Sequence, residues 1–157
     1  MEPRFEDFYR REQPAVYRAA YLATGSRDAA LDATQEAFKR AWIRWLRLRR
    51  YPWAGGWVMT TALNLCRRAN RERNRGRTRV VDDRLGSAPG PGADRVDVQR
   101  ALAALPFRQR EAAILFYLGD LPLATVAQLM GVSEGAVKAH LHAARAKLRA
   151  SLEVLDA

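Results

Sequence analysis

The stretch Leu121–Lys138, LPLATVAQLMGVSEGAVK, decides how the second half of the chain folds. Its spacing predicts two short helices joined by a tight turn. Pro122 suits the first position of a helix, Gly131 suits a left-handed turn, and Ser133 suits the cap of the next helix. After that cap, apolar residues recur at helical spacing and are expected to pack inward: Val137, Leu141, Ala144 and Leu148. Another face of the same helix is polar and mostly cationic: Lys138, His142, Arg145 and Arg149.

Such a helix can present its first turn to the major groove of DNA, with cations behind it for the phosphates. The pattern therefore predicts a DNA-binding helix-turn-helix. A plain helical hairpin is the alternative.

Upstream, residues 56–73 are predicted to form a helix with two distinct faces. One apolar stripe is expected to face the core: Val58, Ala62, Leu65 and Ala69. Another stripe follows at positions i, i+4, i+7, i+11 and i+14: Trp57, Thr61, Asn64, Arg68 and Arg71. An indole, a hydroxyl, an amide and guanidiniums can stack on bases, bond base edges and hold phosphates. The helix is either a nucleic-acid reader or an ordinary amphipathic helix with Trp57 in the core.

The segment just before that helix, Arg47–Trp53 (RLRRYPW), interleaves aromatic residues with Arg. An unstacked base needs a flat apolar wall and a cation for its phosphate. Tyr51 and Trp53 beside Arg50 would supply both. The alternative is that the two rings form a small satellite core beneath a loop.

The remaining periodic segments also read as helices. They are predicted over residues 4–23, ending before Gly25, and over residues 27–48, capped by Ser26. In the second half, helices are predicted over residues 94–105 and from Pro106 to about Gly119. No stretch shows the alternation typical of a strand.

Between the two halves, residues 75–93 contain GSAPGPG and read as a flexible linker. The predicted fold class is therefore all-α. Two small helical domains, residues 1–74 and 94–157, are joined by that linker, and the second contains the helix-turn-helix.

The charge is strongly positive and uneven. The 157 residues carry 27 Lys and Arg against 17 Asp and Glu, a net charge of +10, and the excess lies in the first 80 residues. Such a field attracts polyanions, either nucleic acid or an acidic membrane. The acidic start of the chain and the lack of an apolar run of about 18 residues predict a cytoplasmic protein that is not inserted in a membrane.

Few residues are available for catalysis or metal binding. The single cysteine, Cys66, cannot form an internal disulfide or a multi-cysteine zinc site. His140 and His142 stand two apart on a helix and point in nearly opposite directions, so they cannot share a metal. No phosphate loop or dinucleotide fingerprint occurs. We therefore expect no enzyme activity, no catalytic residue, no metal, no cofactor and no small-molecule substrate.

Four segments together resemble the bacterial sigma-70 family. The segment Asp32–Trp42, DATQEAFKRAW, is similar to the helix that binds core RNA polymerase, and Trp57–Leu65, WVMTTALNL, is similar to the helix that reads the −10 promoter element. Leu105–Glu111, LPFRQRE, and Gly131–Leu141, GVSEGAVKAHL, are similar to the domain that reads the −35 element. The small size and two-domain layout resemble the extracytoplasmic function (ECF) group, in particular its SigE-like members.

The resemblance implies a sigma factor that binds core RNA polymerase, recognises the −35 and −10 elements and promotes DNA opening. It assigns to the surface that meets the polymerase clamp helices Asp32, Gln35, Glu36, Phe38 and Arg40. It assigns to the −10 reader Arg50, Tyr51, Trp53, Trp57, Thr61, Asn64 and Arg68. It assigns to the −35 reader Ser133, Lys138, Ala139, His140, His142 and Arg145. It also implies an anti-sigma factor as a partner, which could hold the chain at the membrane.

Two other classes of protein compete with this interpretation. An autonomous helix-turn-helix regulator would bind DNA without polymerase. It would not need the polymerase-docking helix and second DNA-reading surface that residues 32–71 supply. An enzyme acting on nucleic acid is disfavoured because the sequence offers no acidic or metal-binding constellation.

Overall fold

The computed structural model describes residues 4–76 and 93–156, with side chains for residues 4–73 and 98–151. Its elements in chain order are α1 (Phe5–Thr24), α2 (Arg27–Ile43), α3 (Trp45–Leu48), α4 (Ala54–Gly76), α5 (Ala93–Ala103), α6 (Phe107–Ala113), the π-helical segment η2 (Ile114–Leu118), α7 (Leu123–Met130) and α8 (Glu134–Asp156). No strand occurs in these residues, and the predicted all-α class is confirmed. The predicted linker falls mainly on residues 77–92, outside the described residues.

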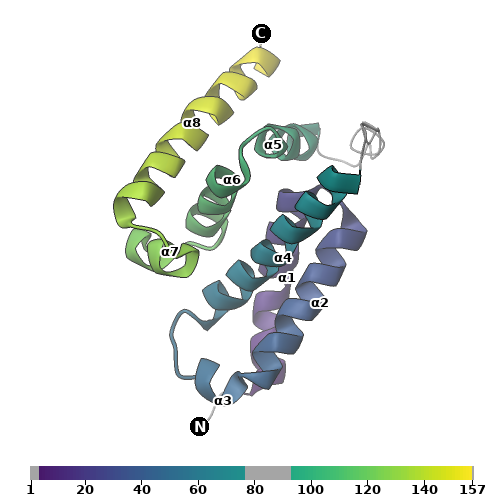
Figure 1. The fold of residues 1–157 in the computed structure, drawn as a ribbon, viewed down its shortest axis with the longest axis vertical. Coiled ribbons are helices and arrows are strands. Elements are labelled where there is room, and N and C mark those ends of the chain that lie inside the picture. Colours follow the sequence, from purple (N-terminus) through teal and green to yellow (C-terminus); the bar gives the residue numbers. More distant parts are fainter. Residues whose placement is uncertain (1–3, 77–92, 157) are drawn as a thin grey trace.

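The first half is a bundle in which α1, α2 and α4 lie side by side, with α3 at one end (Figure 1). Small residues let the helices approach closely: Ala20, Ala37 and Ala62 have no exposed surface. The predicted end of α1 and the predicted start of α2 are confirmed. Gly25 is left-handed, with φ 68°, and the Ser26 hydroxyl accepts a hydrogen bond from the Ala29 N–H at 3.2 Å.

The predicted continuous helix over residues 27–48 is wrong. The chain leaves α2 after Ile43, and α3 begins after Arg44, which has φ −101° and ψ 14°. This turn brings the Trp45 ring against Phe5 and Phe8, with centroid distances of 5.4 and 4.9 Å. Aromatic packing from another helix therefore decides the break, which no Gly or Pro marks in the sequence.

In the second half, the helix-turn-helix is confirmed as α7 and α8. Gly131 is left-handed, with φ 69°, and the Ser133 hydroxyl accepts a hydrogen bond from the Ala136 N–H at 3.0 Å. Val137 and Leu141 are buried as predicted. Pro122 lies one residue earlier than predicted, at the cap of α7.

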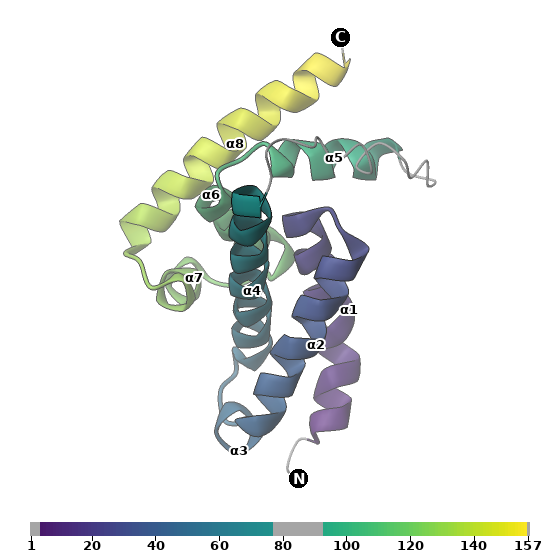
Figure 2. The same cartoon turned by 45° about the vertical axis from the view of Figure 1, so that its right-hand side comes forward.

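The two halves pack on each other and share one hydrophobic core. Figure 2 shows α4 between α2 and α7. A Cβ atom at Gly56 of α4 would lie 2.9 Å from Leu121 Cδ1 and 3.2 Å from Leu129 Cδ1. Gly56 lies in the first turn of α4, and the close approach of the second half leaves no room there for a larger side chain.

Two buried charged residues lie at this junction. The Arg110 guanidinium donates to the Ala23 carbonyl of α1 at 2.5 Å, and to carbonyls of its own half at Leu102, Ala103 and Leu105. The Glu111 side chain has no exposed surface. Its Oε1 accepts from Arg108 at 2.6 Å, and its Oε2 has no partner among the described residues.

Burial raises the pKa of the Glu111 carboxyl, although Arg108 and Arg67 oppose the rise. The folded chain therefore holds this proton more tightly than the unfolded chain. Its contribution to stability is present below the ordinary carboxyl pKa and is lost as the pH rises through the raised value. We expect Glu111→Gln to lessen the loss of stability between pH 4 and pH 8, measured by urea unfolding. Exposed Glu134→Gln is the control, and equal pH dependence in both variants would contradict the prediction.

Cys66 is a packed core residue, as predicted. Its side chain is 1% exposed, and burial raises the pKa of its thiol to about 12. The thiol is therefore protonated near neutral pH and is not a nucleophile.

Candidate nucleic-acid interface

A first hollow, of about 360 Å³, lies among α3, the loop after it and α4. Its lining consists of Arg44, Arg47, Leu48, Tyr51, Trp53 and Trp57, with Gln128 from α7. The Tyr51 and Trp53 rings are stacked, with centroids 4.7 Å apart and planes inclined by 22°. Flat aromatic walls beside guanidiniums can take an unstacked base together with its phosphate.

A second hollow, of about 410 Å³, follows α4. Its lining consists of Arg40, Arg44, Trp57, Thr61, Asn64, Leu65, Arg67 and Arg68. The Thr61 hydroxyl donates to the Trp57 carbonyl at 2.8 Å, and its oxygen remains able to accept a bond. Asn64 and Arg68 are exposed. The predicted polar stripe of α4 therefore faces solvent, where a nucleic-acid strand can reach it.

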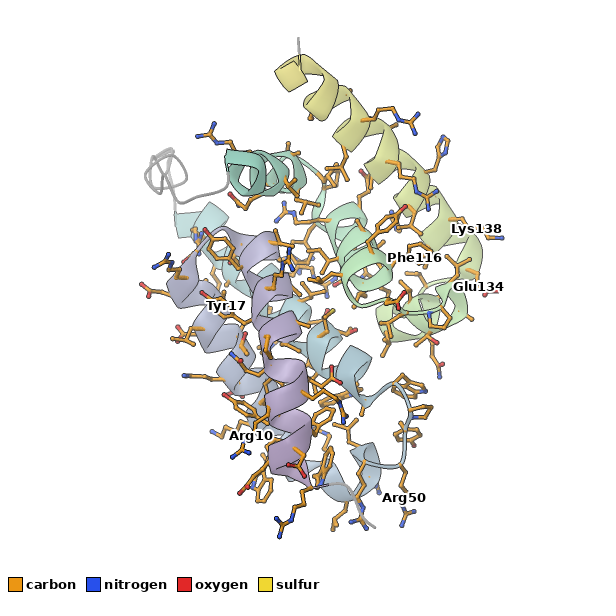
Figure 3. The ribbon with its side chains drawn as sticks, turned by 180° about the vertical axis from the view of Figure 1, so that it is seen from behind. Arg10, Tyr17, Arg50, Phe116, Glu134 and Lys138 are labelled. Atoms are coloured by element: carbon orange, nitrogen blue, oxygen red, sulfur yellow. The ribbon has the colours of Figure 1, made fainter. Side chains whose placement is uncertain are left out.

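Of the residues predicted for this reader, the structure brings all but Arg50 into the two hollows. Arg50 is exposed at the end of the bundle (Figure 3). Trp57 is only half-buried and lines both hollows. It therefore combines the two roles that the sequence left open, because it packs against the core and also forms a wall of the site.

The α2 surface assigned to a partner is only partly as predicted. Asp32 and Gln35 are exposed, and Glu36 accepts from the Arg40 guanidinium at 3.2 Å. Phe38 is 3% exposed and belongs to the core, so it forms no part of the exposed α2 surface. Arg40 also lines the second hollow.

This α2 surface continues into exposed apolar side chains that the sequence analysis missed. Trp42 and Ile43 are 61% and 70% exposed, and Leu31 lies exposed beside Asp32. Large apolar side chains open to solvent are typical of a protein-binding surface.

Most of the residues predicted to contact the −35 element lie on the exposed surface of α8. Lys138 points away from the molecule in Figure 3, and Ala139 and His142 are exposed with it, while His140 is half-buried. The Ser133 hydroxyl is engaged in capping α8. Arg145 is exposed, donates to the Tyr117 hydroxyl and lies over the Tyr117 ring at 5.6 Å.

Comparison with known proteins places these surfaces in a family. Residues 8–76 match the family description "Sigma-70 region 2", and residues 95–148 match "Sigma-70, region 4". The ECF RNA polymerase sigma factor SigM of Mycobacterium tuberculosis is 31% identical over 160 aligned residues, which cover 97% of this chain and 79% of SigM. The chain belongs to the ECF group of the sigma-70 family.

Two further relatives extend the comparison. The ECF sigma factor SigE of Mycolicibacterium smegmatis is 28% identical, over 94% of this chain and 61% of its own. The sigma factor RpoE of Bartonella quintana, solved in complex with the anti-sigma factor NepR, is 26% identical and superposes with a TM-score of 0.79, over 96% of this chain and 97% of its own.

In this sigma factor, the region 2 match contains α2, the second hollow and all of the lining of the first hollow except Gln128, and the region 4 match contains the helix-turn-helix. Sequence reasoning missed Arg44 and Gln128 as lining residues. Arg44 lies in a segment that reads as helix interior, and Gln128 comes from the other half of the chain. No local sequence signal identifies either.

The described residues offer neither a metal site nor a membrane span. There, no three His, Cys, Asp or Glu side chains gather in a way that could hold a metal ion. None of the helices over the same residues combines the length and apolar character needed to cross a membrane.

Proposed function

We propose that this sigma factor docks on core RNA polymerase through the exposed side of α2, reads the −10 element with the two hollows beside α4, and reads the −35 element with α8. It has no catalytic role of its own in this proposal. We place its action in the cytoplasm, where it meets core polymerase and the promoter.

One combination of features supports the proposal: the aromatic and cationic hollows beside α4, the exposed cationic face of α8 and the exposed, partly apolar α2 surface occur in the same chain. An autonomous helix-turn-helix regulator would need only α7 and α8. The stacked Tyr51 and Trp53 rings beside guanidiniums suit an unpaired base rather than a duplex, and such a regulator does not bind unpaired bases.

The packed arrangement of the two halves must open for this function. The −35 and −10 elements lie about 25 base pairs apart, which is about 85 Å at roughly 3.4 Å per base pair. In the structure, α7 packs on α4, and Gln128 lines the same hollow as Trp57. Both readers can reach their elements only after the second half has left α4.

Gly56→Leu is expected to displace the second half, because its side chain would occupy the space of Leu121 and Leu129. The radius of gyration in small-angle X-ray scattering should rise while the helical content stays constant. Gly135→Leu is the matched control, since only Ser133 Oγ lies within 4 Å of a Cβ built there, at 3.8 Å. An unchanged radius of gyration in Gly56→Leu would contradict the expected displacement.

We also propose an anti-sigma factor as a partner. The support is the likeness to RpoE of Bartonella quintana, whose structure was solved with the anti-sigma factor NepR. The exposed apolar side chains of α2, Trp42 and Ile43, offer such a partner the surface that core polymerase also needs.

The function is tested by binding. A fluorescently labelled chain should bind bacterial core polymerase, and the resulting holoenzyme should bind promoter DNA more tightly than core polymerase alone. If the chain does not bind core polymerase but binds a short duplex by itself, the result would favour the autonomous regulator.

Lys138→Ala should weaken promoter binding by removing one phosphate contact. About six phosphate contacts in total give a log–log salt slope near −5, and the variant should reduce its magnitude by about 0.9. Lys147→Ala is the control, because Lys147 donates to Gln109 of α6. An identical slope for the wild type and Lys138→Ala would remove Lys138 from the interface.

A further inference from the structure

Arg44 occupies a fixed position at the break between α2 and α3. Its backbone N–H donates to the Arg40 carbonyl at 3.2 Å, and its own carbonyl accepts from the N–H groups of Arg47 and Leu48, at 3.1 and 2.9 Å. The break itself is set by the packing of Trp45 on the α1 rings. The backbone of Arg44 is therefore held in place by hydrogen bonds and by the packing of Trp45. The Arg44 side chain is exposed and takes no part in forming the break.

The guanidinium of Arg44 lies over the indole of Trp57, with Cζ 5.8 Å from the ring centroid. These two residues line both hollows, so together they form the wall between them. The second hollow is lined by the first half alone, and its volume falls within the range of about 300–1,000 Å³ that is typical of small-molecule sites. A strand that places one base in the first hollow and the neighbouring bases in the second must carry its backbone across this wall.

The charges around the wall fit a phosphate. None of the side chains given above as lining the two hollows is acidic. Arg40 forms an ion pair with Glu36, and the charge of Arg67 interacts electrostatically with the buried Glu111 carboxyl. Arg44 has its contact with the Trp57 ring and no ion pair among the described residues. Its planar fork can hold a phosphate while its face stays on the indole.

We propose that Arg44 is a positioning residue for a single DNA strand. Its guanidinium holds the phosphate that lies between a base in the first hollow and the neighbouring bases beside Thr61 and Asn64. The inference rests on the proposed function, in which this strand is the non-template strand of the opened −10 element. Arg44 then acts on the opened strand and contributes little to binding of the closed duplex.

The test uses holoenzyme assembled from core polymerase and the full chain. The promoter used is the one that gives the strongest product in run-off transcription by this holoenzyme. Two probes are built from it: the closed duplex, and a fork junction whose −10 non-template strand is single-stranded. The variants are Arg44→Ala and Arg44→Lys. Arg10→Ala on α1 loses the same charge from an exposed side chain outside both hollows and is the control (Figure 3).

We expect Arg44→Ala to lose about tenfold in affinity for the fork junction, with core and duplex affinities within about twofold of wild type. The magnitude of its fork-junction salt slope should fall by about 0.7, the value for one phosphate of a single strand. Arg44→Lys should keep the wild-type slope and lose only about threefold, because the charge remains and the stacking is lost. A residue that merely supported Trp57 would not change the slope.

Three results would overturn the proposal: an unchanged affinity for the fork junction, a loss with an unchanged slope, or an equal loss on the duplex. A wild-type holoenzyme that shows no preference for the fork junction would overturn the proposed −10 function together with the role of Arg44. The other three results would remove Arg44 alone.

Discussion

Reversing two charges on α2, as Asp32→Arg with Glu36→Arg, is expected to abolish binding to core RNA polymerase while the helices stay folded. Asp32 is exposed and Glu36 is half-exposed, so neither supports the core. The ion pair of Glu36 with Arg40 lies on the surface, and its loss costs only about 0.5 kcal/mol. Like charges brought together in an interface cost several kcal/mol, and a loss of at least about 100-fold in affinity follows.

The measurement is the affinity of the labelled chain for core polymerase, with helical content from circular dichroism as the check on folding. Glu6→Arg with Asp7→Arg is the matched control, because both residues are exposed on α1 and the change in charge is the same. Wild-type affinity in the α2 variant, with normal helicity, would contradict the docking role of α2.

The second large effect is expected at Trp57. Its indole is half-buried, lies beneath the Arg44 guanidinium and lines both hollows. Stacking of a base on an aromatic side chain contributes about 1–3 kcal/mol. Trp57→Ala should therefore reduce formation of the open promoter complex by roughly 10-fold or more. Binding of the closed duplex should change little.

Open and closed complexes are separated by 2-aminopurine fluorescence in the −10 element and by duplex binding at low temperature. Trp57→Phe is the control, because it keeps an aromatic surface and most of the packing. Equal losses in the two steps would show that Trp57 acts only through the core, where it packs against buried neighbours.

The features predicted correctly from the sequence are those with local causes. The caps at Ser26 and Ser133 and the left-handed Gly25 and Gly131 depend only on neighbours in the chain. The exposed stripe of α4 follows from helical periodicity, which brings Thr61, Asn64 and Arg68 to one hollow.

The features that were missed depend on contacts between distant segments. The break at Arg44 is caused by the α1 rings that receive Trp45, and the approach at Gly56 is caused by leucines of the second half. The family resemblance assigns Phe38 to the docking surface, whereas its ring packs in the core against Phe5, Phe8 and Tyr9 of α1.

Promoter-specific initiation by this chain is tested by run-off transcription with bacterial core polymerase, with and without the chain, on a library of candidate promoters. The proposed function predicts transcripts that depend on the chain and start downstream of shared −35 and −10 elements. Absence of any stimulation, with the chain alone binding short duplexes, would contradict it and remove the assigned roles of α2 and the two hollows.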